Sequence, residues 1–179
     1  MKGPVLRGRR VLLRPLRRPD AVALGRFLKD GHVTRYLPPR VRRESGVAFV
    51  ERVLGEQREG EGFSFVILEV GSHEVVGQIR FFGWYRPLAS AEVGYWLGRR
   101  HWGKGYASEA VRLACRFGFR TMHLHRINAV VVTGNDRSSR VLEKAGFHRE
   151  GTSRRSERAG NGWRDARLYG LLRGELTTH

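Results

Sequence analysis

A glycine-containing turn between a strand-like and a helix-like segment most constrains this chain. Residues 93–97 form a short apolar and aromatic run typical of a strand, and residues 107–118 repeat small and apolar side chains at helical spacing. Gly103 and Gly105 lie between the two segments. Glycine lets the main chain approach an anion closely, and the first amides of a helix carry partial positive charge. The sequence therefore predicts a phosphate-binding turn at the start of a helix.

Two common nucleotide-binding motifs fit this turn poorly. Gly98, Gly103 and Lys104 match most of the phosphate loop G-x-x-x-x-G-K, but Gly105 stands where that loop needs a Ser or Thr to bind magnesium. A dinucleotide fingerprint G-x-G-x-x-G fails at its third glycine, because Ser108 occupies that place. Neither a P-loop NTPase nor a Rossmann dehydrogenase is favoured.

A second motif follows about thirty residues later, in the spacing that one compact domain allows. An alternating, strand-like segment covers residues 126–133, and a short capped helix is predicted after it. Asn135 is a favourable N-cap, Asp136 complements the positive helix end, and Gly146 suits a left-handed stop. The apolar inner face of this helix consists of Val141, Leu142 and Ala145.

Together the two motifs resemble a known enzyme superfamily. Arg100, Gly103 and Gly105 form R-x-x-G-x-G, which resembles the acetyl-CoA pyrophosphate loop of the GNAT N-acetyltransferases. The pattern N-x-x-S-x-x-x-L-x-x-x-G-F, from Asn135 to Phe147, resembles their last conserved helix. The runs 91–97 and 102–107 are similar to the Rim branch, which acetylates protein N termini such as those of ribosomal proteins.

The resemblance implies a mixed α+β fold, with a mostly antiparallel twisted sheet of about seven strands flanked by about four helices. We expect residues 1–179 to form a single N-acetyltransferase domain. The expected strands cover residues 11–16, 63–70, 75–82, 92–97, 126–133, 147–155 and 164–172. Helices are expected over 19–29, 44–59, the 107–118 segment and the stretch after Asn135, with a chain break at Pro38 and Pro39, a loop over 83–90 and a turn over 159–162.

The resemblance also assigns roles in binding acetyl-CoA. The backbone N–H at or beside Leu97 would bind the thioester oxygen, and Asn135 would contact the cofactor, although an N-cap role explains Asn135 equally well. The pyrophosphate would be held by backbone amides and added charge from Arg100, Gly103, Lys104, Gly105, Tyr106 and Ala107.

Acetyl transfer to an amine needs a base, a donor to the oxyanion and a donor to the departing thiolate. Glu92 is the candidate base, because it begins the strand before the loop among apolar neighbours that would raise its pKa. The alternative for Glu92 is a structural carboxylate paired with an arginine. By resemblance Ser138 lies near the sulfur and donates to the thiolate, where many GNAT enzymes use a tyrosine of the same helix. Ser138 could equally be an ordinary first-turn residue.

Length and composition set the protein class. A chain of 179 residues buries roughly 70% of its unfolded surface, which is enough for one enzyme core. No charge-free apolar run reaches the roughly 18 residues of a membrane span, and residues 1–10 lack an apolar signal-peptide centre. The single cysteine, Cys115, excludes an internal disulfide and a cysteine metal cluster, and a buried position is expected for it. We expect a cytoplasmic enzyme without metal or membrane.

The formal net charge is +17, from 34 basic and 17 acidic side chains, and 30 of the basic residues are arginine. Such a surface attracts nucleic acid, a ribosomal surface or an acidic protein segment. Because the arginines are scattered, proteome-wide composition bias is an alternative, and nucleic acid is not favoured. The leading acceptor is therefore a protein or peptide amine, with a polyamine, an aminoglycoside, or a basic RNA-binding role on an inactive GNAT scaffold as alternatives. The sequence leaves monomer and homodimer open.

Overall fold

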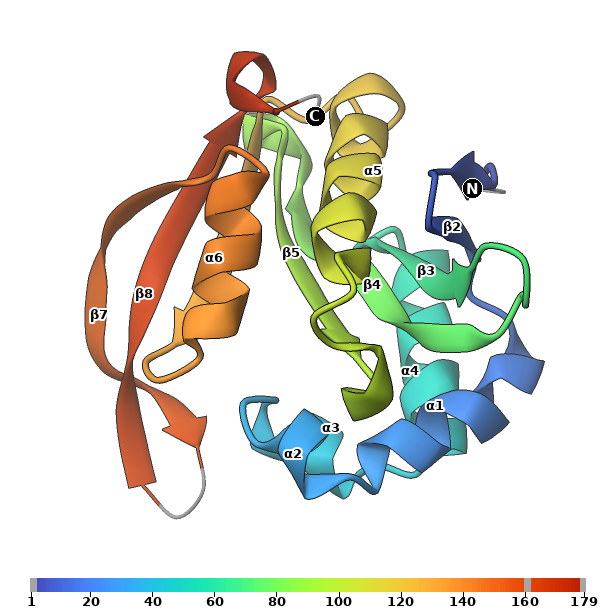
Figure 1. Ribbon diagram of the computed structural model, residues 1–179. Coiled ribbons are helices and arrows are strands. Elements are labelled where there is room, and N and C mark those ends of the chain that lie inside the picture. The colour runs from blue at the N-terminus through green and yellow to red at the C-terminus, as the bar shows by residue number, and fades with distance from the viewer. Residues whose placement is uncertain (1–2, 160–161, 178–179) are drawn as a thin grey trace.

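The computed structural model describes residues 3–159 and 162–177 and contains an eight-stranded sheet in the order β1-β2-β3-β4-β5-β6-β8-β7 (Figure 1). The strands are β1 (Leu6–Arg7), β2 (Val11–Pro15), β3 (Phe63–Glu69), β4 (Val75–Tyr85), β5 (Ser90–Leu97), β6 (Arg126–Val132), β7 (His148–Ala159) and β8 (Gly162–Leu172). Neighbouring strands pair antiparallel except β5 and β6, which pair in parallel. The mostly antiparallel sheet is confirmed, and the strand beyond those expected is the two-residue β1.

The helices of the described residues are α1 (Ala21–Leu28), α2 (Gly31–Thr34), α3 (Pro39–Arg43), α4 (Gly46–Arg58), α5 (Tyr106–Arg120) and α6 (Asp136–Lys144). The four longer ones match the helices expected from sequence, and the mixed α+β fold is confirmed. The short α2 and α3 were not expected. Pro39 does not break the chain but starts α3, because proline fits the first turn of a helix, where its missing N–H costs nothing.

The helices bury two apolar layers, one on each face of the sheet. Helices α5 and α6 lie in front of the sheet in Figure 1 and cover a core that includes Cys115 and Leu142. Helices α1 and α4 cover the other face, where Trp96 of β5 packs with Phe49. Cys115 is fully buried, as expected. Since side chains alternate along β5, the strand contributes to both layers.

The two helices on the second face cross at a pair of glycines. A Cβ on Gly46 would lie 2.7 Å from Gly25 Cα, so α1 and α4 approach more closely than larger side chains would allow. The start of α4 is capped by Ser45, whose Oγ accepts from the amide of Ala48 at 3.1 Å. Before α1, the buried Asp20 carboxylate accepts two bonds from the Arg14 guanidinium, at 2.6 and 2.8 Å. These contacts hold the helix layer against the sheet.

The strands also extend beyond the expected limits. The expected loop over 83–90 is partly strand, because β4 runs on to Tyr85 before a short 3-10 turn, Arg86–Leu88. Strands β7 and β8 form a long hairpin with register shifts between Arg149 and Gly151 and between Ser153 and Glu157. Of the expected turn over 159–162, residues 160 and 161 lie outside the described residues.

Candidate active site

The glycine turn leads directly into α5. Gly103 and Gly105 adopt positive φ angles of +77° and +80°, which side-chain-bearing residues rarely adopt. The helical ladder begins where the Glu109 amide donates to the Gly105 carbonyl at 3.2 Å, so the amides of residues 106–108 precede it. These amides carry the positive end of the helix dipole. The turn thus presents the geometry that anion binding requires.

A basic turn from the other end of the chain supports this loop. The Glu109 carboxylate accepts from the backbone amides of Arg9 and Arg10, at 2.5 and 3.0 Å. The Arg10 guanidinium donates from Nη1 to the Lys104 carbonyl at 3.1 Å. Arg10 was not among the residues predicted to bind the cofactor. Arg10 lies 94 residues before Lys104, so no local pattern indicated this contact.

The two basic side chains of the loop point in different directions. Arg100 forms an ion pair with Glu74 in the turn between β3 and β4, and its Nε donates to His101 Nε2 at 3.0 Å. The ammonium of Lys104 lies 5.8 Å from the centre of the Tyr106 ring. The charge of Arg100 is therefore partly compensated within the chain. Lys104 carries no ion pair to a described residue and remains the freer positive charge.

The Tyr106 side chain faces away from the turn. Its hydroxyl donates to the Glu69 carboxylate at the end of β3, and this bond lowers the pKa of Glu69 and raises the pKa of Tyr106. Ala107 is half-buried. Tyr106 and Ala107 can thus meet an anion through their amides, as the sequence predicted, while the Tyr106 hydroxyl anchors the start of α5 to the sheet.

Beside this turn the sheet opens. Strand β5 pairs with β6 over three residues only, ending at Glu92 and Asn128, while β5 continues along β4 as far as Leu97. The Gly98 amide donates to the carbonyl of Val76, near the start of β4, at 2.9 Å. Because successive amides of a strand point to opposite edges, the Leu97 N–H points to the edge that β6 has left. Among the described residues, the Leu97 N–H therefore has no strand partner, at the position to which the resemblance assigned the thioester oxygen.

Trp102 helps to form this opening. Its indole Nε1 donates to the Leu97 carbonyl at 2.9 Å, so the aromatic ring lies against the end of β5. The Arg137 guanidinium at the start of α6 lies 5.2 Å from the centre of the same ring. Trp102 thus joins the glycine turn, the strand end and α6.

Glu92 lies at the last pair before the strands diverge. Its even position places it on the same side of β5 as Trp96, toward α1 and α4. The pKa of Glu92 is raised to about 7, mainly by burial and also by the nearby charge of Glu157, while Arg80 opposes the shift. Glu92 has no salt bridge to a described residue, so the structural alternative of a simple arginine pair is not observed. A carboxylate with this pKa is suited to accept a proton near neutral pH.

Glu157 of β7 was not found by sequence analysis. Burial also raises the pKa of Glu157, and the residue pairs across the hairpin with Arg164 of β8. A second carboxylate therefore contributes to the field at Glu92. No sequence motif indicated that Glu157 lies near Glu92, because this proximity depends on the register shift in β7.

Asn135 and Ser138 lie at the start of α6, the helix that covers the face of the sheet opposite to α1 and α4. Asn135 occupies the N-cap position, but its side chain makes no capping bond within the described residues, while its carbonyl accepts from the Ser138 amide at 3.0 Å. The Ser138 Oγ lies 2.9 Å from the Tyr95 hydroxyl of β5. The interpretation of Asn135 as a side-chain cap is thus not supported, and its amide is available to other partners.

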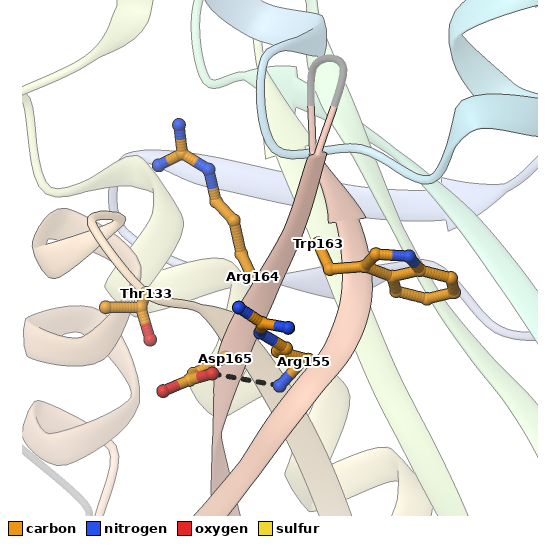
Figure 2. A pocket seen from close by; sticks show the side chains of 5 residues that line it. All are labelled: Thr133, Arg155, Trp163, Arg164 and Asp165. Carbon is orange, nitrogen blue, oxygen red and sulfur yellow. Dashed lines mark hydrogen bonds between the residues drawn. The ribbon is translucent and has the colours of Figure 1, made fainter.

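An open hollow lies between the hairpin and the end of β6. Its lining residues are Thr133, Arg155, Trp163, Arg164 and Asp165 (Figure 2). Asp165 accepts from the Arg155 amide at 2.9 Å, and Figure 2 shows Trp163 pointing to the opposite side of the hairpin from Thr133. The two guanidinium groups make this hollow suited to carboxylates or phosphates.

The segment after α2 meets the connection between β6 and α6 at one contact. The Tyr36 hydroxyl, just after α2, donates to the Gly134 carbonyl at 2.9 Å. A Cβ on Gly134 would lie 3.7 Å from Arg164 Nη1, which places Arg164 at the same point. The segment after α2, the β6–α6 connection and the hairpin therefore converge at Gly134.

A family model described as an acetyltransferase (GNAT) domain matches residues 10–148. The chain belongs to the GNAT acetyltransferase family. GNAT enzymes use acetyl-CoA as the acetyl donor, and the expected identification as an N-acetyltransferase is confirmed. Within the described residues, no helix has both the length and the apolarity of a membrane span, and no group of three or more His, Cys, Asp or Glu could hold a metal ion.

GNAT relatives of this chain match over most of its length. The uncharacterized N-acetyltransferase p20 of Bacillus licheniformis is 33% identical over 168 residues, covering 93% of this chain and 94% of the relative. The [ribosomal protein uS5]-alanine N-acetyltransferase of Escherichia coli is 31% identical over 121 residues, 67% of this chain and 62% of the relative. The second match supports the resemblance to the Rim branch.

A solved GNAT structure agrees with the fold. RimJ of Mycobacterium smegmatis, in complex with CoA-disulfide, has a TM-score of 0.85 and 30% identity, covering 98% of this chain and 88% of that chain. The expected fold is thus confirmed.

Proposed function

We propose that this chain binds acetyl-CoA at the α5 turn and transfers the acetyl group to the N-terminal α-amine of a protein or peptide, in one domain spanning residues 1–179. The divergence of β5 from β6 carries the proposal, because among the described residues it leaves the Leu97 N–H without a strand partner, at the end of β5 that leads into the turn before α5. One end of the cofactor would meet residues 103–107, and its thioester would enter the opening. Lys104 and Arg10 supply positive charge there.

The reaction is direct attack of the amine on the thioester carbonyl. A C–N bond forms, the C–S bond breaks, and the electron pair of that bond remains on sulfur. Glu92 takes the proton that the amine loses, directly or through one water molecule, and its pKa of about 7 is close to the pH at which a base works best. The Leu97 N–H stabilises the carbonyl oxygen as it gains charge. Ser138 donates a hydrogen bond to the thiolate, and Asn135 contacts the cofactor.

The charge distribution around the opening favours a peptide over a polyamine. Glu92 and Glu157 provide a small negative region where an ammonium group can bind before it loses its proton. Outside that region lie Arg155 and Arg164 in the hairpin hollow. A polyamine carries further positive charges that these arginines would repel, whereas a peptide with acidic groups after its N-terminus fits both regions.

The test is mass spectrometry of peptides with free N termini after incubation with acetyl-CoA, with spermidine and an aminoglycoside in parallel. We expect acetylation of a peptide α-amine, and more of it when acidic residues follow the first position. Glu92→Gln should lower kcat/KM by about 10²- to 10⁴-fold while CoA affinity is retained. The matched control is Glu59→Gln, at an exposed carboxylate after α4.

Three outcomes would contradict parts of the proposal. Acetylation of spermidine or the aminoglycoside alone would contradict a peptide acceptor but would still support acetyltransferase activity. Full activity in Glu92→Gln would remove Glu92 as the base. RNA binding that weakens steeply with salt, combined with no acetyl transfer to any amine, would favour a binding role on an inactive scaffold.

A further inference from the structure

Tyr95 is a half-buried polar side chain that the mechanism above does not use. It lies on β5 three residues after Glu92, and its odd position turns the side chain to the α5 and α6 side of the sheet. The hydroxyl crosses the opening between β5 and β6 and reaches α6. There it lies 2.9 Å from Ser138 Oγ and 3.2 Å from the Ser138 carbonyl oxygen. Both contacts are to the residue that would face the leaving sulfur.

The two hydroxyls can share their protons in two ways. In one arrangement Tyr95 donates to the Ser138 carbonyl, and Ser138 donates to the Tyr95 oxygen, which uses the serine proton. In the other, Tyr95 donates to Ser138 Oγ, and the serine proton is free to point elsewhere. A hydroxyl that accepts one hydrogen bond is polarised and donates a stronger one. The second arrangement therefore makes Ser138 a better donor.

Tyr95 is also suited to remain the donor. Burial raises the pKa of Tyr95 well above its ordinary value, more than the hydrogen bond to Ser138 lowers it. The phenol therefore stays protonated around neutral pH and serves as a fixed O–H rather than as an acid. Neither Tyr95 nor Ser138 needs to lose its proton in this role.

We propose that Tyr95 is a positioning residue that holds the Ser138 hydroxyl with its proton directed at the departing thiolate of CoA. The inference rests on the proposed function, because it needs the sulfur beside Ser138. As the C–S bond breaks, sulfur keeps the electron pair and accepts the Ser138 hydrogen bond, while Tyr95 donates to Ser138 Oγ. The thiolate takes its proton from solvent after release. The amine proton has already gone to Glu92.

The experiment is a double-mutant cycle of Tyr95→Phe and Ser138→Ala. Tyr95→Phe keeps the ring that fills the core and removes only the oxygen. We expect kcat to fall about 3- to 10-fold in Tyr95→Phe, with the KM for acetyl-CoA unchanged. If Tyr95 acts through Ser138, the double variant should be no slower than Ser138→Ala. A merely structural tyrosine would instead give additive losses or a changed KM, and either result would overturn the inference.

The matched control is Tyr169→Phe. Tyr169 is buried in the same core, but its hydroxyl donates to Glu143 at 3.2 Å rather than to Ser138. Tyr169→Phe should remove a comparable hydrogen bond and leave kcat unchanged. A loss of kcat in Tyr169→Phe equal to that in Tyr95→Phe would attribute both effects to core packing and reject the role of Tyr95.

A binding measurement tests the role of Tyr95 independently of which amine accepts the acetyl group. CoA and desulfo-CoA, which lacks the sulfur, are titrated calorimetrically into each variant. The wild type should prefer CoA several-fold, about the value of one hydrogen bond, and both Tyr95→Phe and Ser138→Ala should lose that preference. A preference that survives in Tyr95→Phe overturns the inference even if acetylation works. A wild type that binds CoA but acetylates no amine contradicts the proposed transfer and leaves this comparison decisive for Tyr95.

Discussion

The Arg10 guanidinium donates from Nη1 to the Lys104 carbonyl at 3.1 Å, which joins the turn before β2 to the anion-binding turn before α5. A Cβ added to Gly105 would collide with the same guanidinium. The contact explains how the loop keeps its shape and how a positive charge reaches it from a distant part of the sequence.

Arg10→Gln should therefore weaken CoA binding. The variant removes one charge-assisted bond and one positive charge beside the expected pyrophosphate, so Kd should rise about 3- to 10-fold. Calorimetry with CoA measures this, and Arg7→Gln in the exposed part of β1 serves as the control. Equal affinities of wild type and Arg10→Gln would show that the loop does not depend on this contact.

The two glycines of the turn should respond differently to substitution. Both have positive φ, so Gly103→Ala and Gly105→Ala should each cost roughly 1–2 kcal/mol of backbone strain. Only the methyl group at Gly105 meets another side chain, because no atom lies within 4 Å of a Cβ at Gly103. We expect a larger loss of thermal stability and CoA affinity in Gly105→Ala. The opposite order, from thermal melts and calorimetry, would contradict this account of the turn.

The pH dependence of activity should report on Glu92. Since the base must be deprotonated, kcat/KM should rise with pH through an apparent pKa near 7. The charge of Glu157 raises the pKa of Glu92, so Glu157→Gln should shift the acidic limb of the profile to lower pH. Arg80→Gln should shift the limb to higher pH, because Arg80 lowers that pKa. Glu59→Gln should leave the profile unchanged, and shifts of the reverse sign would rule out this electrostatic coupling.

Sequence reasoning located the elements of the site better than their contacts. Gly103 and Gly105 marked the turn because positive φ and helix starts are local properties. The apolar and aromatic run correctly indicated a strand at Glu92, although β5 begins two residues earlier, at Ser90. Arg10, Tyr95 and Glu157 were missed, since the role of each depends on a contact with a segment distant in the sequence. Glu157 also depends on a register shift within β7, for which the sequence carries no clear mark.

Asn135 shows the limit of local patterns in the other direction. Its position at the start of α6 was correctly predicted, yet its side chain does not cap the helix within the described residues. Its position therefore indicated a bond from the helix amides to its side chain that the structure does not show. N-cap preference is a statistical rule, and the backbone angles at Asn135 are not the extended ones that capping residues typically adopt.

Two N-cap variants separate stability from binding. Ser45 caps α4 through its side chain, so Ser45→Ala should lower the free energy of unfolding by about 1 kcal/mol and leave CoA affinity unchanged. Asn135→Ala should do the reverse, with little change in stability and weaker CoA binding, if its amide contacts the cofactor. Urea unfolding and calorimetry provide the two readouts. A loss of stability in Asn135→Ala equal to that in Ser45→Ala would restore the capping role.

The central claim is that the amides at the start of α5 and the open edge of β5 bind coenzyme A. Calorimetric titration of the purified protein with CoA tests it most directly. The account predicts saturable binding of one CoA per chain, weakened by Gly105→Ala and unaffected by Ser45→Ala. Absence of any CoA binding to the folded wild-type protein would contradict it.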